Sequence, residues 1–231
     1  MMDDVAKFSE IGDRYGEQLA RGLRLTGENA EYFARGRIAR VAAFAQEHDF
    51  RVASVLDFGC GTGSSLAILR EQFPSAEIVG FEPAPGLRAL AHGAAMKIGA
   101  HVVDSDSLSL DRAVDLVYCN GVFHHIPLHD RHKATSAMAR ALRTDGLACV
   151  WENSPFNPGT RFVMSRVEFD RDAVLLTPGE VRQYHKANGL RPMATEYHFI
   201  FPRALRFARV FEHALRGLPL GGQFLVASGR D

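Results

Sequence analysis

The chain has 231 residues, of which 46% are hydrophobic, and its 27 basic and 27 acidic residues cancel to a formal charge of zero. This length allows one α/β domain with a substantial core, while the balanced charge argues against the broad positive field that nucleic-acid binding requires. No segment approaches the roughly 18 to 20 apolar residues needed to cross a bilayer, and the N-terminal MMDDVAKFSE does not resemble a signal peptide. We therefore expect a cytoplasmic protein with neither a membrane nor a nucleic-acid partner.

Three cysteines are too few for a disulfide framework, and all of them fall in apolar runs, as expected in a reducing compartment: Cys60, Cys119 and Cys149. The first fifty residues are predicted to be helical, because apolar residues such as Tyr32, Ile38 and Val41 recur at helical spacing. We interpret residues 1–50 as a helical lid or substrate-entry segment and residues 51–231 as the domain with which it forms one compact unit. The oligomeric state stays open.

From residue 51 onward, short β-branched runs alternate with helical stretches, the pattern of a buried parallel sheet with crossover helices. Strands are predicted at 52–57, 76–81, 101–103, 114–119, 147–152, 190–199 and 222–228. Helices are predicted at 64–73, 85–97, 130–142, 178–188 and 202–216. Asp145 and Gly146 mark a stop before the fifth strand, and the turn formers of ENSPFNPGT follow it. The expected fold is a single-domain, doubly wound α/β fold with a seven-stranded, mostly parallel sheet.

The segment VLDFGCGTG, residues 55–63, leads from a buried strand through a glycine turn into a helix. Glycine allows a sharp turn and a close approach of the backbone to a ligand, while the helix N-terminus presents unpaired N–H groups. A dinucleotide-binding turn has glycines at its first, third and sixth positions, whereas Gly59, Gly61 and Gly63 occupy the first, third and fifth, with Ser64 sixth. Pyrophosphate recognition is therefore disfavoured, and a purely structural turn is the plain alternative.

The motif DFGCGTG resembles the first motif of class I S-adenosylmethionine-dependent methyltransferases, in which the glycine turn receives the amino-acid end of the cofactor. This resemblance implies S-adenosylmethionine as cofactor, S-adenosylhomocysteine as product, and a last strand that runs antiparallel at or near the sheet edge. The residues it implies at this end of the cofactor are Asp57, Gly59, Cys60, Gly61 and Gly63.

The next two strand ends continue the resemblance. In IVGFEPA, Glu82 and then Pro83 occupy the place of the acidic residue that accepts hydrogen bonds from both ribose hydroxyls, although many relatives have aspartate there. After the third strand, HVVDSDSL resembles the segment that holds the adenine, and its register favours Asp104 over Asp106. The implied contacts to the base are Asp104 and the backbone of Ser105, with Leu87 or Phe81 as an apolar neighbour; a helix cap or turn is the alternative role of the aspartate.

The fourth strand segment, VDLVYCNGVFHHI, resembles the part of the superfamily fold that lies between cofactor and acceptor. It implies that Asn120 and Gly121 lie against the methionine portion of the donor. At the N-terminus, Tyr15 in FSEIGDRYGEQL resembles the tyrosine that closes over the donor in several small-molecule methyltransferases.

Two adjacent histidines follow the fourth strand, where an acceptor is expected to approach. Methyl transfer mainly requires alignment of nucleophile and methyl group, but a hydroxyl or ammonium acceptor also needs a base, and His124 or His125 is a candidate. A packing role for either histidine is the alternative. No metal site is expected, because Pro127 interrupts the register that would align these histidines with His129 and His132.

The acceptor side is expected in residues 1–50 and roughly 153–220, both rich in aromatic side chains. Most of these pack in the core or wall an apolar cavity: Phe8, Tyr15, Tyr32, Phe33, Phe156, Phe162, Phe169, Tyr184, Tyr197, Phe199 and Phe201. Basic residues in the second region form either a local anion site or a solvated helix face: Arg161, Arg166, Arg171, Arg203, Arg206 and Arg209.

These patterns together predict an enzyme that methylates an oxygen, nitrogen or carbon of a small-molecule acceptor. Two other hypotheses remain. The first is a noncatalytic module that binds S-adenosylmethionine or a partner, since ligand binding does not entail chemistry. The second is a nicotinamide-dependent oxidoreductase, which the missing sixth-position glycine disfavours.

Overall fold

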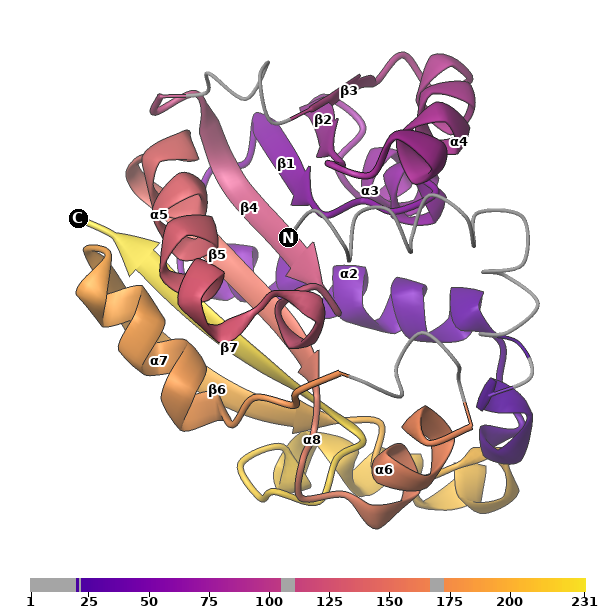
Figure 1. The fold of residues 1–231 in the computed structure, drawn as a ribbon. Coiled ribbons are helices and arrows are strands. Elements are labelled where there is room, and N and C mark those ends of the chain that lie inside the picture. Colours follow the sequence, from indigo (N-terminus) through magenta and orange to yellow (C-terminus); the bar gives the residue numbers. More distant parts are fainter. Residues whose placement is uncertain (1–19, 21, 105–110, 167–172) are drawn as a thin grey trace.

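The computed structural model describes residue 20 and residues 22–104, 111–166 and 173–231. Its centre is one seven-stranded sheet in the order β3-β2-β1-β4-β5-β7-β6 (Figure 1). The strands are β1 Ser54–Phe58, β2 Glu77–Phe81, β3 His101–Val103, β4 Val114–Asn120, β5 Leu142–Asn153, β6 Leu190–His198 and β7 Gln223–Arg230. All seven predicted strands are confirmed, with small shifts at their ends except for β5, which starts earlier than predicted.

The sheet is parallel from β3 to β5, and only β7 is antiparallel to its neighbours β5 and β6. The expected antiparallel last strand is therefore confirmed, and it lies one strand in from the edge. The strand order reverses between β1 and β4, which are neighbours in the sheet although two strands separate them along the chain. In open α/β sheets the crevice beyond the carboxyl ends of strands at such a reversal is the usual ligand site.

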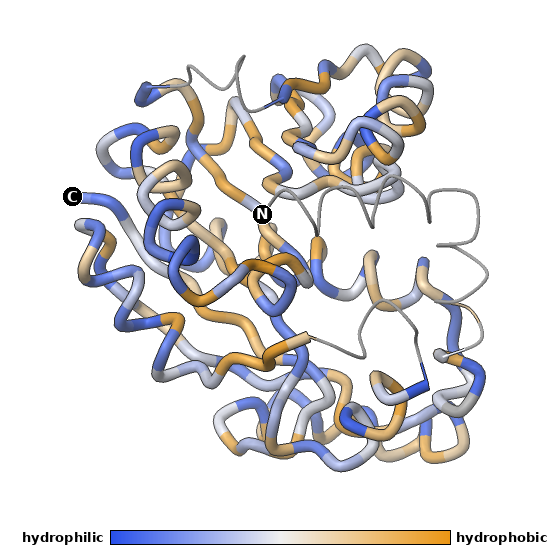
Figure 2. The backbone as a smooth tube through the Cα atoms, viewed as in Figure 1, coloured by the Kyte–Doolittle hydropathy of each residue, from blue (hydrophilic) through white to orange (hydrophobic). Residues whose placement is uncertain are grey.

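Helices cover both faces of the sheet, as Figure 1 shows. One face packs against α2 Ala30–Glu47, α3 Ser64–Gln72 and α4 Pro85–Met96, and the other against α5 Arg131–Ala141 and α7 Pro178–Ala187. Successive residues of β1 serve opposite faces, since Val55 belongs to the first core cluster and Leu56 to the second, which is the alternation expected of a strand. Figure 2 shows apolar backbone concentrated along these central strands.

Part of the predicted lid is a core element. The face of α2 that carries Ile38, Val41 and Phe44 is buried against the sheet, so residues 30–47 help to support the domain. Residues 1–19, which include Phe8 and Tyr15, lie outside the described residues. A division into a lid of residues 1–50 and a domain of residues 51–231 stays a prediction.

Three local predictions differ from the structure. The segment ENSPFNPGT contains the start of a helix, α6 Pro158–Met164, because Asn157 caps it by accepting the N–H of Thr160 and proline suits its first position. The predicted helix 202–216 is instead the 3-10 helix η5 Arg203–Phe211 followed by the short α8 Glu212–Leu215; neither has a buried residue to hold a regular α-helix against a core. Finally, β5 starts at Leu142, before the predicted stop, and Asp145 within it has a φ of 61°.

Candidate cofactor and acceptor site

The glycine turn lies at the carboxyl end of β1, where the N–H groups of Gly59 and Cys60 both donate to the carbonyl of Phe81 at the end of β2. The φ angles of Gly59, Gly61 and Gly63 are 77°, 58° and 80°, a region that favours glycine. A Cβ on Gly59 would lie 2.5 Å from Cγ2 of Val122, whereas one on Gly61 would have no atom within 4 Å. Gly61 therefore borders open space, and a ligand in that space can come close to its backbone.

Cys60 contributes only its backbone to the turn. Its side chain is buried in the core, with Sγ 2.8 Å from the place of a Cβ on Gly80, and burial raises the pKa of its thiol. Cys60, one of the predicted cofactor contacts, can therefore contact a ligand only through its backbone.

Asp57 is a buried carboxyl group in β1. Its side chain is 2% exposed, and its Oδ2 has no hydrogen-bond partner within the described part of the chain. Burial, with a further contribution from the charge of Glu82, raises the pKa of Asp57 to about 7, while Arg37 opposes this shift. A buried carboxyl oxygen without a partner is costly unless a ligand completes it, so this atom points to a bound cation or hydrogen-bond donor.

Glu82 connects the ends of β1 and β2. One carboxylate oxygen accepts the N–H of Gly61 and the other accepts that of Ala84, each at 2.9 Å. Burial raises the pKa of Glu82, and these two hydrogen bonds act against the rise. Each oxygen has a second lone pair, so the carboxylate can still accept hydrogen bonds from a pair of hydroxyls.

The predicted adenine side lies between α4 and the end of β3. Leu87 is buried in α4, and the half-buried Asp104 lies 3.7 Å from Nη2 of Arg88. Arg88 also donates to the carbonyls of Glu82 and Pro83, so it connects the ribose side to the adenine side. Ser105 and Asp106 lie outside the described residues, which leaves the choice between the two aspartates open.

A histidine and a glutamate form a buried pair beyond β4. His124 lies in a short 3-10 helix, Phe123–His125, and its Nδ1 is 2.5 Å from Oε2 of Glu152 at the end of β5. The other carboxylate oxygen accepts the N–H of Phe123 at 2.7 Å. Because the Glu152 carboxylate contacts both the backbone N–H of Phe123 and the ring of His124, it holds the imidazole in one orientation. The ring centroid of His125 is 4.0 Å from that of His124.

Beside this pair is a cavity of about 400 Å³. Asn120, Gly121, His124 and His125 form one wall of it, at the carboxyl end of β4. The remaining walls come from residues 23–28, α2, α6, η5 and the chain around β6 and β7. Their aromatic members are Tyr32, Phe33, Phe162, Phe199 and Phe201. Of the other predicted wall residues, Phe156 is exposed, while Tyr184 and Tyr197 pack against the second core cluster.

Arg37 is a site residue that the sequence analysis missed. It projects from α2, is 8% exposed, and donates to Gln223 Oε1 at 2.9 Å and to the Tyr118 hydroxyl at 3.3 Å. It borders the cavity, and its charge lowers the pKa of Asp57. Glu152 was missed as well, although an acidic residue ending the strand beside β4 was a usable signal.

The predicted arginine cluster does not converge on the cavity. Among its described members only Arg209 borders it, and this guanidinium is paired with Glu28 at 3.0 Å and lies 4.8 Å from the ring centroid of Tyr32. Arg171 lies outside the described residues.

In the part of the chain that the structure describes, no three His, Cys, Asp or Glu side chains are grouped as metal ligands, and no helix is long and apolar enough to cross a membrane.

Known proteins are similar to this chain in sequence and in fold. Residues 55–146 match the family model of the methyltransferase domain. Trans-aconitate 2-methyltransferase of Methylobacterium nodulans is 30% identical over 115 residues, which are 50% of this chain and 44% of that protein. The enzyme of the same name from an Enterobacter species is 26% identical over 120 residues, 52% of this chain and 47% of its own length. The chain thus matches less than half the length of these curated relatives.

Two solved structures show the same fold. A TehB-like SAM-dependent methyltransferase from Corynebacterium glutamicum has a TM-score of 0.60 at 21% identity, covering 98% of both chains. Geranyl diphosphate C-methyltransferase from Streptomyces coelicolor, solved with Mg²⁺, geranyl diphosphate and S-adenosylhomocysteine, has a TM-score of 0.59 at 17% identity, covering 84% of this chain and 80% of its own.

The strand order, the glycine turn after β1 and the carboxylate after β2 define a class I methyltransferase fold. The chain therefore has the fold of these methyltransferases, and its residues 55–146 are similar to the methyltransferase domain that the family model describes.

Proposed function

We propose that this protein transfers a methyl group from S-adenosylmethionine to an oxygen, nitrogen or carbon atom of a small molecule by in-line displacement. The observation that carries the proposal is the buried Oδ2 of Asp57, which has no hydrogen-bond partner among the described residues and lies beside the glycine turn. The buried guanidinium of Arg37 is close enough for its charge to lower the pKa of Asp57. One negative and one positive group at the same crevice suit the amino-acid end of the donor, which carries both an ammonium and a carboxylate.

The residues present fit such a donor. Asp57 would accept a hydrogen bond from its ammonium group, and Arg37 would pair with its carboxylate. Glu82 can still accept hydrogen bonds from the ribose hydroxyls. Contact of Leu87 and Asp104 with the adenine stays a prediction. Gly61 leaves room for the backbone to meet the ligand closely. When bound, S-adenosylmethionine supplies a methyl group on a positively charged sulfur, which activates that carbon for displacement.

The chain's own contribution is to position the acceptor and to manage its proton. Since the carboxylate of Glu152 only accepts hydrogen bonds, the proton between it and His124 belongs to Nδ1 of the ring. A base role then falls to Nε2, which would take the proton of a hydroxyl acceptor as the new bond to carbon forms, or that of an ammonium acceptor before it forms. The carbon–sulfur bond of the donor would break in the same displacement, with S-adenosylhomocysteine as the leaving group. His125 borders the same cavity and is the second candidate base.

The composition of the cavity favours a compact and largely apolar acceptor. The relatives named above act on trans-aconitate and geranyl diphosphate, both anions. Of the two arginines that border the cavity, Arg209 is paired with Glu28, and Arg37 is the one that we assign to the carboxylate of the donor. Five aromatic rings make up much of the remaining wall. An uncharged acceptor with one nucleophilic atom needs no further cation in such a cavity.

Calorimetric titration with S-adenosylmethionine, S-adenosylhomocysteine and NADH tests the assignment of the donor. We expect the first two to bind, and Asp57→Ala and Glu82→Ala to weaken them at least tenfold in variants shown to be folded. Glu77→Ala, which removes an exposed carboxylate from the opposite end of β2, is the matched control. Binding of NADH alone would replace the proposal with the oxidoreductase. Donor binding without turnover across a broad acceptor screen would favour the noncatalytic module.

A further inference from the structure

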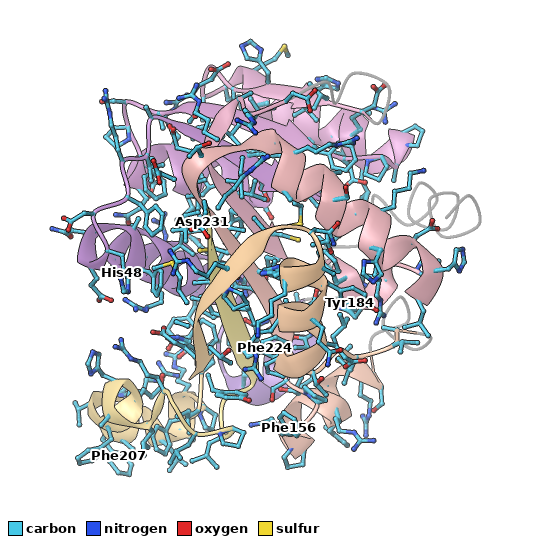
Figure 3. The ribbon with its side chains drawn as sticks, turned by 90° about the vertical axis from the view of Figure 1, so that its left-hand side faces the viewer. His48, Phe156, Tyr184, Phe207, Phe224 and Asp231 are labelled. Atoms are coloured by element: carbon cyan, nitrogen blue, oxygen red, sulfur yellow. The ribbon has the colours of Figure 1, made fainter. Side chains whose placement is uncertain are left out.

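One end of the molecule is formed by two segments that lie side by side, residues 154–166 with α6 and residues 202–220 with η5 and α8. The side-chain amide of Asn157 donates to the carbonyl of Leu220 at 2.7 Å, which connects them directly. Both segments are at the bottom of Figure 1, and Figure 3, turned by 90°, has Phe156 and Phe207 at that same end. We call these two segments the basic apolar surface.

This surface exposes many large apolar side chains. Val210 is 77% exposed, Phe207 73% and Phe211 61%. The others are Phe156, Phe162, Leu205, Leu218 and Leu220. The helices α2 to α7 each bury residues, but η5 and α8 bury none. A soluble monomer seldom exposes so large an apolar patch without a binding partner for it.

The same surface is strongly basic, although the chain as a whole has no net charge. Its two segments contain six arginines and one carboxylate, that of Glu212, which accepts the N–H of Phe201. Arg209 and Arg216 face Glu28 and Glu196. The exposed arginines are Arg161, Arg166, Arg203 and Arg206. Figure 2 shows hydrophilic and hydrophobic backbone alternating along this end.

We propose that the basic apolar surface binds the interface of a lipid bilayer that contains anionic lipids. Aromatic and aliphatic side chains flanked by arginines are the composition of interfacial segments, which place the former at the acyl boundary and the latter among headgroups. A soluble anion would explain the arginines but not Phe207 and Val210. A second copy of the chain would bring two basic surfaces together, which like-charge repulsion opposes. The absence of a membrane-spanning helix among the described residues does not bear on this binding mode, because the surface would lie on the bilayer.

The location of the surface gives it a functional meaning that rests on the proposed methyl transfer. Phe162 of the first segment and Pro202 and Arg209 of the second border the cavity. Docking would therefore hold the acceptor cavity directly behind the lipid surface, where an apolar acceptor concentrates. The binding itself requires no catalysis, so the two proposals can fail separately.

Co-sedimentation with sucrose-loaded vesicles tests the proposal on the full chain. Vesicles of phosphatidylcholine alone are compared with vesicles containing phosphatidylglycerol, at low and high salt. We expect sedimentation with the anionic vesicles that weakens as salt increases. Arg206→Gln should weaken the partition coefficient about five-fold, since each basic residue near such a surface contributes about 1 kcal/mol. Phe207→Ser combined with Val210→Ser should reduce it by at least tenfold.

The matched control combines Met96→Ser with Lys97→Gln at the exposed end of α4, which should sediment like the wild type. Unchanged thermal unfolding and S-adenosylhomocysteine binding would show that all variants are folded. Three results would overturn the proposal: a chain that stays in the supernatant with both kinds of vesicle, variants that sediment like the wild type, or a wild-type dimer that Phe207→Ser and Val210→Ser convert to a monomer. Stabilisation by inorganic phosphate without vesicle binding would instead identify a soluble-anion site.

Discussion

Nδ1 of His124 lies 2.5 Å from Oε2 of Glu152, and both side chains are almost completely buried. His124 follows the end of β4, Glu152 lies near the end of the neighbouring strand β5, and His124 borders the acceptor cavity. Glu152 itself is held by the N–H of Phe123, one residue before the histidine. The ring therefore has little rotational freedom, and its tautomer depends on the carboxylate.

Glu152→Gln tests this dependence. An amide can donate to Nδ1, which would move the ring proton to Nε2 and remove the proposed base, so transfer to a hydroxyl acceptor should fall by about 10²-fold or more. Ring-nitrogen NMR should show the wild-type proton on Nδ1 and a change of tautomer in the variant. His125→Gln is the companion variant that distinguishes between the two candidate bases. A large loss of turnover in His125→Gln, with Glu152→Gln fully active, would assign the base to His125.

The raised pKa of Asp57 predicts that ligand binding releases a proton. Its pKa of about 7 means that most molecules carry a neutral Asp57 at pH 6, whereas an ammonium group beside it favours the carboxylate. Binding of S-adenosylhomocysteine at pH 6 should therefore release a sizeable fraction of one proton. Calorimetry in buffers with different ionisation enthalpies measures that fraction. Asp57→Asn should bind more weakly and release none, and equal release from the variant would assign the proton to another group.

Arg37 is expected to recognise the carboxylate end of the donor. Arg37→Gln should weaken S-adenosylhomocysteine at least tenfold, because a charge-assisted hydrogen bond contributes roughly 1.5 to 3 kcal/mol. Methylthioadenosine lacks the amino-acid end, so its affinity should change little. Calorimetry on the two ligands provides an internal control, and an equal loss for both would indicate a general disturbance of the site.

Two glycines of the turn should respond differently to alanine. Gly59→Ala would place a Cβ 2.5 Å from Val122, in addition to a positive φ, and should destabilise the fold by more than about 2 kcal/mol. Gly61→Ala has open space and should cost roughly 1 to 2 kcal/mol from its φ alone, while weakening S-adenosylhomocysteine. Urea unfolding and calorimetry separate the two effects. Similar stability of both variants would contradict the described geometry.

His185 should make the fold sensitive to acid. It is fully buried in α7 with Nδ1 2.7 Å from the Ser228 hydroxyl, and burial lowers its pKa to about 4 from the usual 6.5. The unfolded chain takes up a proton below pH 6.5 and the folded one only near pH 4, so stability is lost as the pH falls through this range, by up to about 3 kcal/mol. His185→Gln should remove this loss in urea unfolding, whereas the exposed His129→Gln should not.

Much of the fold was predictable, because each strand of a buried sheet has a local signature. Val55, Ile78 and Leu116 lie in short apolar runs between turn residues and helical stretches, and the glycines of the turn identify the ligand class directly. The departures come from segments whose structure depends on distant contacts. Asn157 and Pro158 signal a turn and a helix start equally well, and residues 203–216 have helical periodicity but no core to pack against.

The site was less accessible from sequence. Arg37 is one of several basic residues on a helix, and only the packing of α2 on the sheet brings it opposite Asp57. Glu152 is 28 residues from His124 along the chain, so their contact depends on the pairing of β4 with β5. Tyr15, Ser105 and Asp106 stay predictions.

The insertion of β7 between β5 and β6 has a consequence for how the chain is made. β6 joins the sheet only through β7, although β6 precedes it in the sequence. During synthesis, residues 178–198 therefore emerge from the ribosome before the strand on which they dock, and must wait for residues 223–230 to follow. A nascent chain stopped at Gly222 would lack β7, the strand that pairs β6 with the rest of the sheet.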